Sequence, residues 1–144
     1  MKRTASTLVR HITILIRLKR KSRLRRKGYG KCLSSRPDAF VSAYSVVSFV
    51  SFRHQGSLEN LMGEHKYDEK LLRRFSAELN VTDLTPPGFI WHSRGDSVVP
   101  VENSIQLGMA MAVKNRPFEL HIFPGGDHGA GVAFPDVMPK SGRR

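Results

Sequence analysis

The fold is decided by residues Pro86–Gly131, which read PPGFIWHSRGDSVVPVENSIQLGMAMAVKNRPFELHIFPGGDHGAG. The two prolines enforce an extended approach to Gly88–His92 (GFIWH), an apolar run that predicts a buried strand. A loop at Ser93–Val99 leads into a helix predicted over Pro100–Lys114, and a last strand is predicted at Phe118–Phe123. Strand, helix and strand joined by short links predict parallel strands with a helix packed against them.

Further elements are predicted upstream of this stretch. Ala39–Val46 is a strand candidate, Phe49–Lys66 has no steady period and reads as loop with one helical turn, and Asp68–Leu79 predicts a helix. Asp68 is a suitable N-terminal cap for that helix, and Asn80 a suitable stop. The helix positions expected to face the core are Leu71, Leu72, Phe75, Leu79, Ile105, Gly108, Met109, Ala112 and Val113. The predicted fold class is α/β, with parallel strands and flanking helices.

The charge is distributed unevenly along the 144 residues, which carry a net charge of +12. Residues 1–31 contain twelve Lys or Arg and no Asp or Glu, whereas from Cys32 onward twelve basic residues balance twelve acidic ones. Like charges at this density repel one another and favour a solvated segment. We therefore expect residues 1–35 to form a basic arm outside the core, and residues 36–144 to form the domain.

The charge of the basic arm raises the question of a nucleic-acid partner. Its densest run, Lys19–Lys27, could attract phosphates by charge alone, but it has no aromatic neighbour except Tyr29 and no nucleic-acid-binding fold accompanies it. A nucleic-acid partner is therefore not expected. No apolar run reaches the ~18 residues that a membrane span needs. The single cysteine, Cys32, excludes an intramolecular disulfide, and a cytoplasmic location is expected.

Asp96 and His128 are the candidate catalytic residues. Each follows a predicted parallel strand, and the carboxyl ends of such strands meet at one edge of the sheet. A carboxylate that accepts a hydrogen bond from a histidine fixes its tautomer and stabilises the imidazolium. The alternative for Asp96 is a carboxylate that favours the start of the next helix, and for His128 a loop histidine among glycines.

Other polar residues are interpreted more simply. Asp127 is interpreted as a solvated turn residue, Trp91 as core, and His92 and His121 as packing or surface residues on strands. The remaining histidines are His11, His54 and His65. Their spacing from Cys32 and from one another does not match that of metal ligands. No metal and no cofactor are expected.

The motifs carry a family resemblance over residues 36–133. Pro86–Ser104 followed by Pro117–Gly131 resembles the terminal region of α/β-hydrolases, and is most similar to the acetyl-xylan-esterase-like and prolyl-oligopeptidase-like serine hydrolases. The family's acid stands in a D-x-x-V-P turn and its histidine in a G-G-x-H-G loop. The matching residues here are Asp96, Val99 and Pro100 for the turn, and Gly125, Gly126, His128 and Gly129 for the loop.

The resemblance implies the C-terminal part of an α/β-hydrolase with Asp96 as triad acid and His128 as base. The family's nucleophile stands in G-x-S-x-G upstream of Arg36, and no G-x-S-x-G occurs in this sequence. Ser57 lacks that glycine turn, and neither Ser34 nor Ser35 has it.

The expected function is therefore a truncated serine hydrolase that is inactive alone. The implied parent substrates are short acyl esters, with peptides as the alternative. Two other functions stay open. One is a non-enzymatic binding protein that uses the basic arm for nucleic acid or an anionic partner. The other is half of a split hydrolase, in which another chain supplies the first five strands and the serine. An open edge of the Ala39–Val46 strand also favours self-association or pairing with such a complementing chain.

Overall fold

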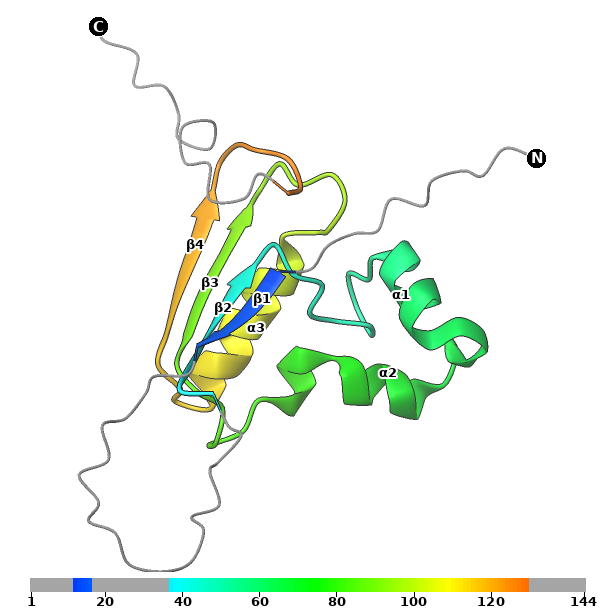
Figure 1. The fold of residues 1–144 in the computed structure, drawn as a ribbon, viewed down its shortest axis with the longest axis horizontal. Coiled ribbons are helices and arrows are strands. Elements are labelled where there is room, and N and C mark those ends of the chain that lie inside the picture. The colour runs from blue at the N-terminus through cyan, green and yellow to red at the C-terminus, as the bar shows by residue number, and fades with distance from the viewer. Residues whose placement is uncertain (1–11, 17–36, 130–144) are drawn as a thin grey trace, which may run out of the picture.

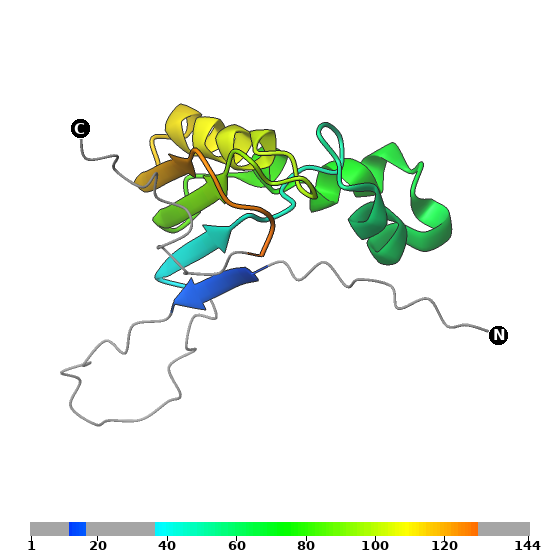
Figure 2. The same ribbon diagram turned by 90° about the horizontal axis from the view of Figure 1, so that it is seen from above.

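The structure is a computed structural model that describes residues 12–16 and 37–129. These residues form a four-stranded sheet with helices on one face (Figures 1 and 2). The strand order follows the sequence: β1 Ile12–Ile16, β2 Ala39–Ala43, β3 Gly88–Ser93 and β4 Phe118–Phe123. Strands β2, β3 and β4 run parallel, which confirms the predicted α/β class and the predicted order of those strands.

The strands differ from prediction at one end. β3 and β4 match the predicted runs closely, whereas β2 stops at Ala43 and not at Val46. Tyr44 has a φ of 39°, in the left-handed region, so the chain turns out of the sheet directly after Ala43.

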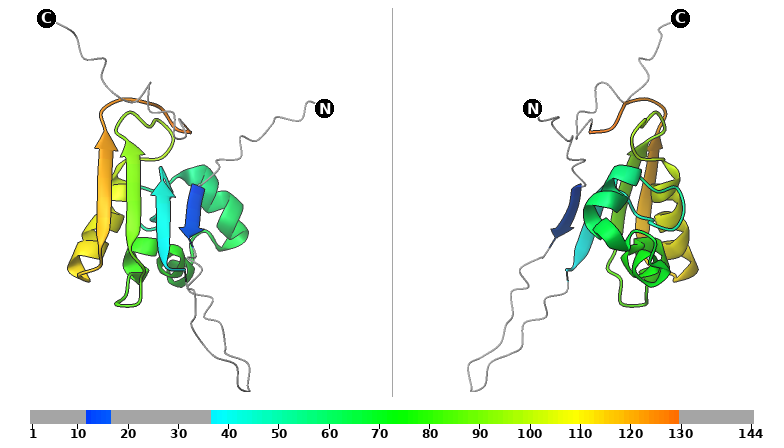
Figure 3. Two further views of the ribbon diagram at one scale, coloured as in Figure 1. Left: turned by 60° about the vertical axis from the view of Figure 1, so that its left-hand side comes forward. Right: turned by 90° about the vertical axis from the view of Figure 1, so that its right-hand side faces the viewer.

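The edge of β2 that was expected to be open is paired. β1 runs antiparallel to β2 with Ile12 opposite Ala43, and it lies at the edge of the sheet (Figure 3, left). It comes from the basic segment, of which five residues thus join the sheet. The charged run Lys19–Lys27 and Ser34 lie outside the described residues, so the division into arm and domain stays a prediction.

The described helices all lie on one face of the sheet (Figure 3, right). They are α1 Gln55–Met62, the short 3-10 helix η1 Gly63–His65, α2 Glu69–Phe75, the 3-10 helix η2 Ala77–Asn80 and α3 Glu102–Val113. None of them combines the length and the apolar character that crossing a bilayer requires.

Helix α1 was predicted only as loop with a single turn. Its start is capped by His54, whose Nδ1 accepts a hydrogen bond from Ser57 N–H at 3.1 Å. Only Leu58 and Met62 are buried, one turn apart. Two buried residues in eight give too weak a period to identify a helix from the sequence.

The predicted helix Asp68–Leu79 is divided in two by Ser76. Its predicted cap is confirmed, since Asp68 accepts hydrogen bonds from the backbone N–H groups of Lys70 and Leu71. Ser76 is extended and fully buried; its hydroxyl donates to Leu72 O and accepts from Phe49 N–H. This bond to a distant loop ends α2 at Phe75, which is exposed, as is Leu79, contrary to prediction.

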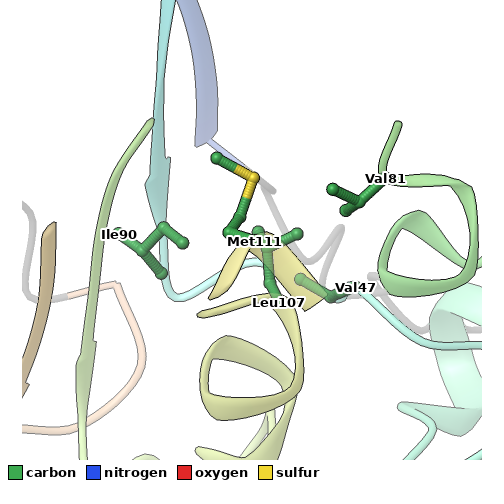
Figure 4. Close-up of a cluster of buried hydrophobic side chains, with 5 residues drawn as sticks. All are labelled: Val47, Val81, Ile90, Leu107 and Met111. Carbon is green, nitrogen blue, oxygen red and sulfur yellow. The ribbon is translucent and has the colours of Figure 1, made fainter. Parts of the chain in front are cut away.

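The core between α3 and the sheet is a cluster of five apolar side chains: Val47, Val81, Ile90, Leu107 and Met111 (Figure 4). The predicted core face of α3 was wrong except at Gly108. Ile105, Met109 and Val113 are 37%, 64% and 78% exposed, whereas Asn103 and Ser104 are fully buried.

Hydrogen bonds explain this rotation of α3. Asn103 Oδ1 accepts from the backbone N–H groups of Val47 and Ser48 at 2.9 and 3.0 Å, and its Nδ2 donates to Phe52 O at 2.8 Å. Buried backbone groups need such partners, so polar residues of α3 face inward and several apolar ones face outward.

Candidate functional site

The loops after β3 and β4 lie at the same end of the sheet (Figure 1). They bring Asp96 and His128 together: His128 Nδ1 lies 2.8 Å from Asp96 Oδ2. The Asp96 side chain is 0% exposed and the His128 side chain 12%. The predicted contact is confirmed, and the catalytic role of the two residues stays a prediction.

Asp96 is held by its own loop. Its Oδ1 accepts hydrogen bonds from the backbone N–H groups of Val98 and Val99, at 2.9 and 2.8 Å. Burial raises the pKa of Asp96, but the Val99 N–H, the His128 ring and the Val98 N–H outweigh it and leave the pKa below its usual range. Asp96 is therefore an ionised carboxylate that only accepts hydrogen bonds, and Nδ1 of His128 carries the proton.

The other ring nitrogen of His128 has a different environment. Its Nε2 is buried and has no hydrogen-bond partner among the described residues. The ring of Tyr44 packs edge-on against the His128 ring, with ring centres 5.0 Å apart. Burial, followed by the Asp96 charge, raises the pKa of Tyr44, which keeps this neighbour neutral. Among the described residues, Nε2 is thus an acceptor without a donor.

Asp127 joins the two loops. Its Oδ1 accepts from Ser97 N–H at 3.1 Å, from the Ser97 hydroxyl at 2.8 Å and from His128 N–H at 2.8 Å. These bonds, the His128 N–H first, lower the pKa of Asp127. The residue is exposed as predicted, but it also ties the Asp96 loop to the His128 loop, which the sequence analysis missed.

Gly95 allows the two loops to approach closely. A Cβ atom at this position would lie 2.9 Å from the carbonyl oxygen of Gly126, closer than real Cβ contacts come. Gly126 itself has a φ of 97°, which side chains other than glycine rarely adopt.

His92 is the site residue that sequence reasoning missed. It is fully buried, and its Nε2 lies 3.1 Å from Asp96 Oδ2 and 3.0 Å from Val99 O. Its Nδ1 lies 2.8 Å from the Ser104 hydroxyl. A signal was present: His92 shares the inward face of β3 with Gly88 and Ile90, and a buried histidine in such a row needs polar partners.

The remaining candidates make other contacts. Ser57 is hydrogen-bonded to His54, with its hydroxyl 2.9 Å from Nδ1, at the start of α1. His121 is exposed beside Glu119, and Trp91 is buried, as expected. Within residues 12–16 and 37–129, no group of three His, Cys, Asp or Glu is placed to hold a metal ion.

The arrangement is suited to proton transfer. An Nδ1–H held by a buried carboxylate leaves Nε2 as the basic nitrogen, and the carboxylate stabilises the ring once Nε2 is protonated. No serine hydroxyl in the described part of the chain contacts Nε2. Within the described residues, the site therefore contains a histidine–carboxylate pair and no serine hydroxyl in contact with Nε2.

Comparison with known sequences gives a family match and two curated relatives. The sequence profile of the prolyl oligopeptidase family matches residues 29–139. Endo-1,4-beta-xylanase B of Butyrivibrio fibrisolvens is 44% identical over 101 residues, which are 70% of this chain and 16% of that protein. The acetylxylan esterase of Xylanibacter ruminicola is 37% identical over 100 residues, which are 67% of this chain and 21% of that protein.

A solved structure is also similar. The acetyl ester-xyloside bifunctional hydrolase of Caldicellulosiruptor lactoaceticus is 48% identical, with a TM-score of 0.66. The match covers 68% of this chain and 36% of that one. The chain thus spans about a fifth or less of the length of the two curated relatives and about a third of the solved one.

Proposed function

The chain belongs to the prolyl oligopeptidase family and has an α/β-hydrolase fold, and on that premise we propose that it carries the acid and base of a serine esterase. Asp96 is the acid and His128 the base. The observation that carries the proposal is the 2.8 Å contact between Asp96 Oδ2 and His128 Nδ1 beside a buried, unoccupied Nε2. The substrate class is a short acyl ester, because two relatives are named for acetyl esters.

The role of each group follows from its protonation. In acyl transfer, a serine hydroxyl attacks the acyl carbon while His128 Nε2 takes its proton. The Asp96 carboxylate stabilises the imidazolium, and Nε2 then returns the proton to the departing alcohol. A water molecule releases the acyl group by the same route. No cofactor takes part in these steps.

The nucleophile is not supplied by a recognisable motif among the 144 residues, since they contain no G-x-S-x-G. Among the described serines, Ser57 is hydrogen-bonded to His54, and Ser104 to His92. We propose that the chain alone does not turn over esters. A positioned base without its nucleophile leaves only weak general-base hydrolysis.

A second candidate is one half of a split hydrolase. It is favoured by the buried Nε2 of His128, which faces no partner within the described ranges, since a buried polar atom without a partner is costly. In that case another polypeptide supplies the serine. A peptide in place of an acyl ester is the alternative substrate, because the family name includes peptidases.

The test uses the purified full chain, a short-chain aryl ester and a serine-directed fluorophosphonate probe. We expect hydrolysis that is not measurably above that of a His128→Ala variant, and no serine labelled in stoichiometric amount. Hydrolysis or labelling that is abolished by His128→Ala would show that the chain contains its own nucleophile. In that case mass spectrometry would identify the labelled serine as the nucleophile, and the proposal that the chain lacks one would be wrong.

A further inference from the structure

His92 is a buried histidine that the proposed mechanism does not yet use. It lies near the end of β3 and its side chain is fully buried. It makes three polar contacts: Asp96 Oδ2 at 3.1 Å, Val99 O at 3.0 Å and Ser104 Oγ at 2.8 Å. These contacts connect strand β3, the Asp96 loop and helix α3 at one side chain.

The three contacts fix the protonation of the ring. A carbonyl oxygen can only accept, so the contact with Val99 O places the proton on Nε2. That N–H is shared between Val99 O and Asp96 Oδ2. Nδ1 then accepts from the Ser104 hydroxyl. Burial lowers the pKa of His92 against the opposing effect of Asp96, so the ring is neutral.

Asp96 needs such a contact because its backbone partners hold only Oδ1 and leave the rotation of the carboxylate weakly restricted. The Val98 and Val99 N–H groups hold Oδ1, but rotation of a carboxylate about its last bond is broad and only weakly restricted. Without a further partner, Oδ2 would be held only by His128, which is itself on a loop. His92 holds Oδ2 from the sheet.

We propose that His92 is a positioning residue for the Asp96–His128 pair. Its Nε2–H sets the plane of the Asp96 carboxylate so that Oδ2 faces Nδ1 of His128. The proposal rests on the proposed function and adds a member to the same site. With His92 included, four N–H groups donate to the Asp96 carboxylate, which has about four lone pairs that can accept. Four donors favour the ionised form of the carboxylate, which can only accept hydrogen bonds.

The first experiment needs no variant. Nitrogen-15 NMR of the labelled full chain at neutral pH reports the tautomer of each ring. We expect His92 as the neutral Nε2–H form and His128 with its proton on Nδ1. A charged His92, or a His92 with its proton on Nδ1, overturns the proposal.

An Asp96→Asn variant separates this proposal from the proposed function. The amide oxygen must accept from Val98 and Val99, which places the amide N–H₂ against Nδ1 of His128. We expect the His128 proton to move from Nδ1 to Nε2. If the His128 signals are unchanged in this variant, the acid–base pair itself is wrong, whatever the state of His92.

Three substitutions of His92 then test positioning against simple packing. His92→Gln reaches Asp96 with an N–H donor, His92→Leu fills the space without a donor, and His92→Asn keeps a polar partner for Ser104 but is too short to reach Asp96. We expect the slowly exchanging Nδ1–H signal of His128 to persist in the Gln variant and to be lost in the Leu and Asn variants. Ser104→Ala is the matched control and should keep the signal, because Val99 O still fixes the tautomer.

Two results contradict the proposal. If the His128 signal persists in a folded Leu or Asn variant, His92 does not position Asp96. If the signal is lost in the Gln variant as well, while its backbone amide spectrum matches the wild type, packing of the imidazole is what matters. If the Leu variant does not fold, the His128 signal of the Asn variant decides between positioning and packing. The tautomer of His92 in the wild-type chain tests the proposal in either case.

Discussion

Oδ2 of Asp96 lies 2.8 Å from Nδ1 of His128, although the two residues are 32 positions apart in the sequence. The contact results from parallel pairing of β3 and β4, which places the loops after both strands at one edge of the sheet. Asp127 then holds the loops together by hydrogen bonds, and Gly95 lets them approach closely. The geometry of the site therefore depends on the loops as much as on the two side chains.

Asp96→Ala should destabilise the chain strongly. It leaves the N–H groups of Val98, Val99 and His128 without their acceptor and the His92 N–H with Val99 O alone, which should cost roughly 3 kcal/mol in the free energy of unfolding. Urea unfolding followed by the fluorescence of Trp91, the only tryptophan, measures it. Asp83→Ala, at an exposed loop position, is the control and should stay close to wild type.

Gly95→Ala should push the two loops apart. The new methyl group would meet the Gly126 carbonyl at 2.9 Å, and such overpacking costs about 1–3 kcal/mol. Gly125→Ala is a matched control in the same pair of loops, because no atom lies within 4 Å of the added Cβ. Hydrogen exchange over residues 93–99 and 125–129 should speed up in the first variant only. Equal exchange in both variants would show that the loops do not depend on this approach.

Asn103→Ala should lower the stability of the chain more than any substitution at an exposed position of α3. The variant removes the acceptor of two buried N–H groups, those of Val47 and Ser48, at a cost of about 1–3 kcal/mol for each group left without a partner. Met109→Ala, which alters a side chain that is 64% exposed, should change stability by less than about 0.5 kcal/mol. Thermal unfolding by circular dichroism compares the two. A similar midpoint for both would mean that α3 is not held by Asn103.

Stability should fall in two steps as the solution becomes acidic. Burial lowers the pKa of His92, so its contribution is complete above about 6.5 and is lost as the pH falls below that value. Burial also lowers the pKa of His54, which adds to the same window. The pKa of Asp96 is lowered as well, so its contribution is present above about 4 and is lost as the pH falls through the lowered value.

The same variants locate these two steps. His92→Gln should flatten the decline just below pH 6.5 without abolishing it, because His54 remains. Urea unfolding at a series of pH values provides the comparison. An identical slope in wild type and His92→Gln would show that His92 is not buried in its neutral form.

The sequence could predict the elements whose patterns are local. Gly88–His92 and Phe118–Phe123 are apolar runs between turn signals, and both are strands. Their order also predicted the meeting of Asp96 and His128, because parallel strands share their carboxyl edge. Long-range hydrogen bonds could not be predicted in this way. Ser76 divides a helix by bonding to Phe49, and Asn103 and Ser104 turn the polar side of α3 inward.

The site shows the same limit. The position of His92 on the inward face of β3 could be inferred from alternation, but its contact with Asp96 depends on how the turn after β3 folds back. The role of Asp127 as a link between loops depends on Ser97, thirty positions away. Pairs of this kind carry no periodic signal.

We propose above that Asp96 and His128 are the acid and base of a serine hydrolase. The most direct measurement grafts residues 37–144 into the Caldicellulosiruptor hydrolase in place of the segment they match, and compares kcat/KM for an acetyl ester with that of the same chimera carrying His128→Ala. We predict that the chimera hydrolyses the ester and that His128→Ala lowers kcat/KM by at least about 10²-fold, the usual minimum for a general base. A folded chimera whose hydrolysis is unchanged by His128→Ala would contradict the account.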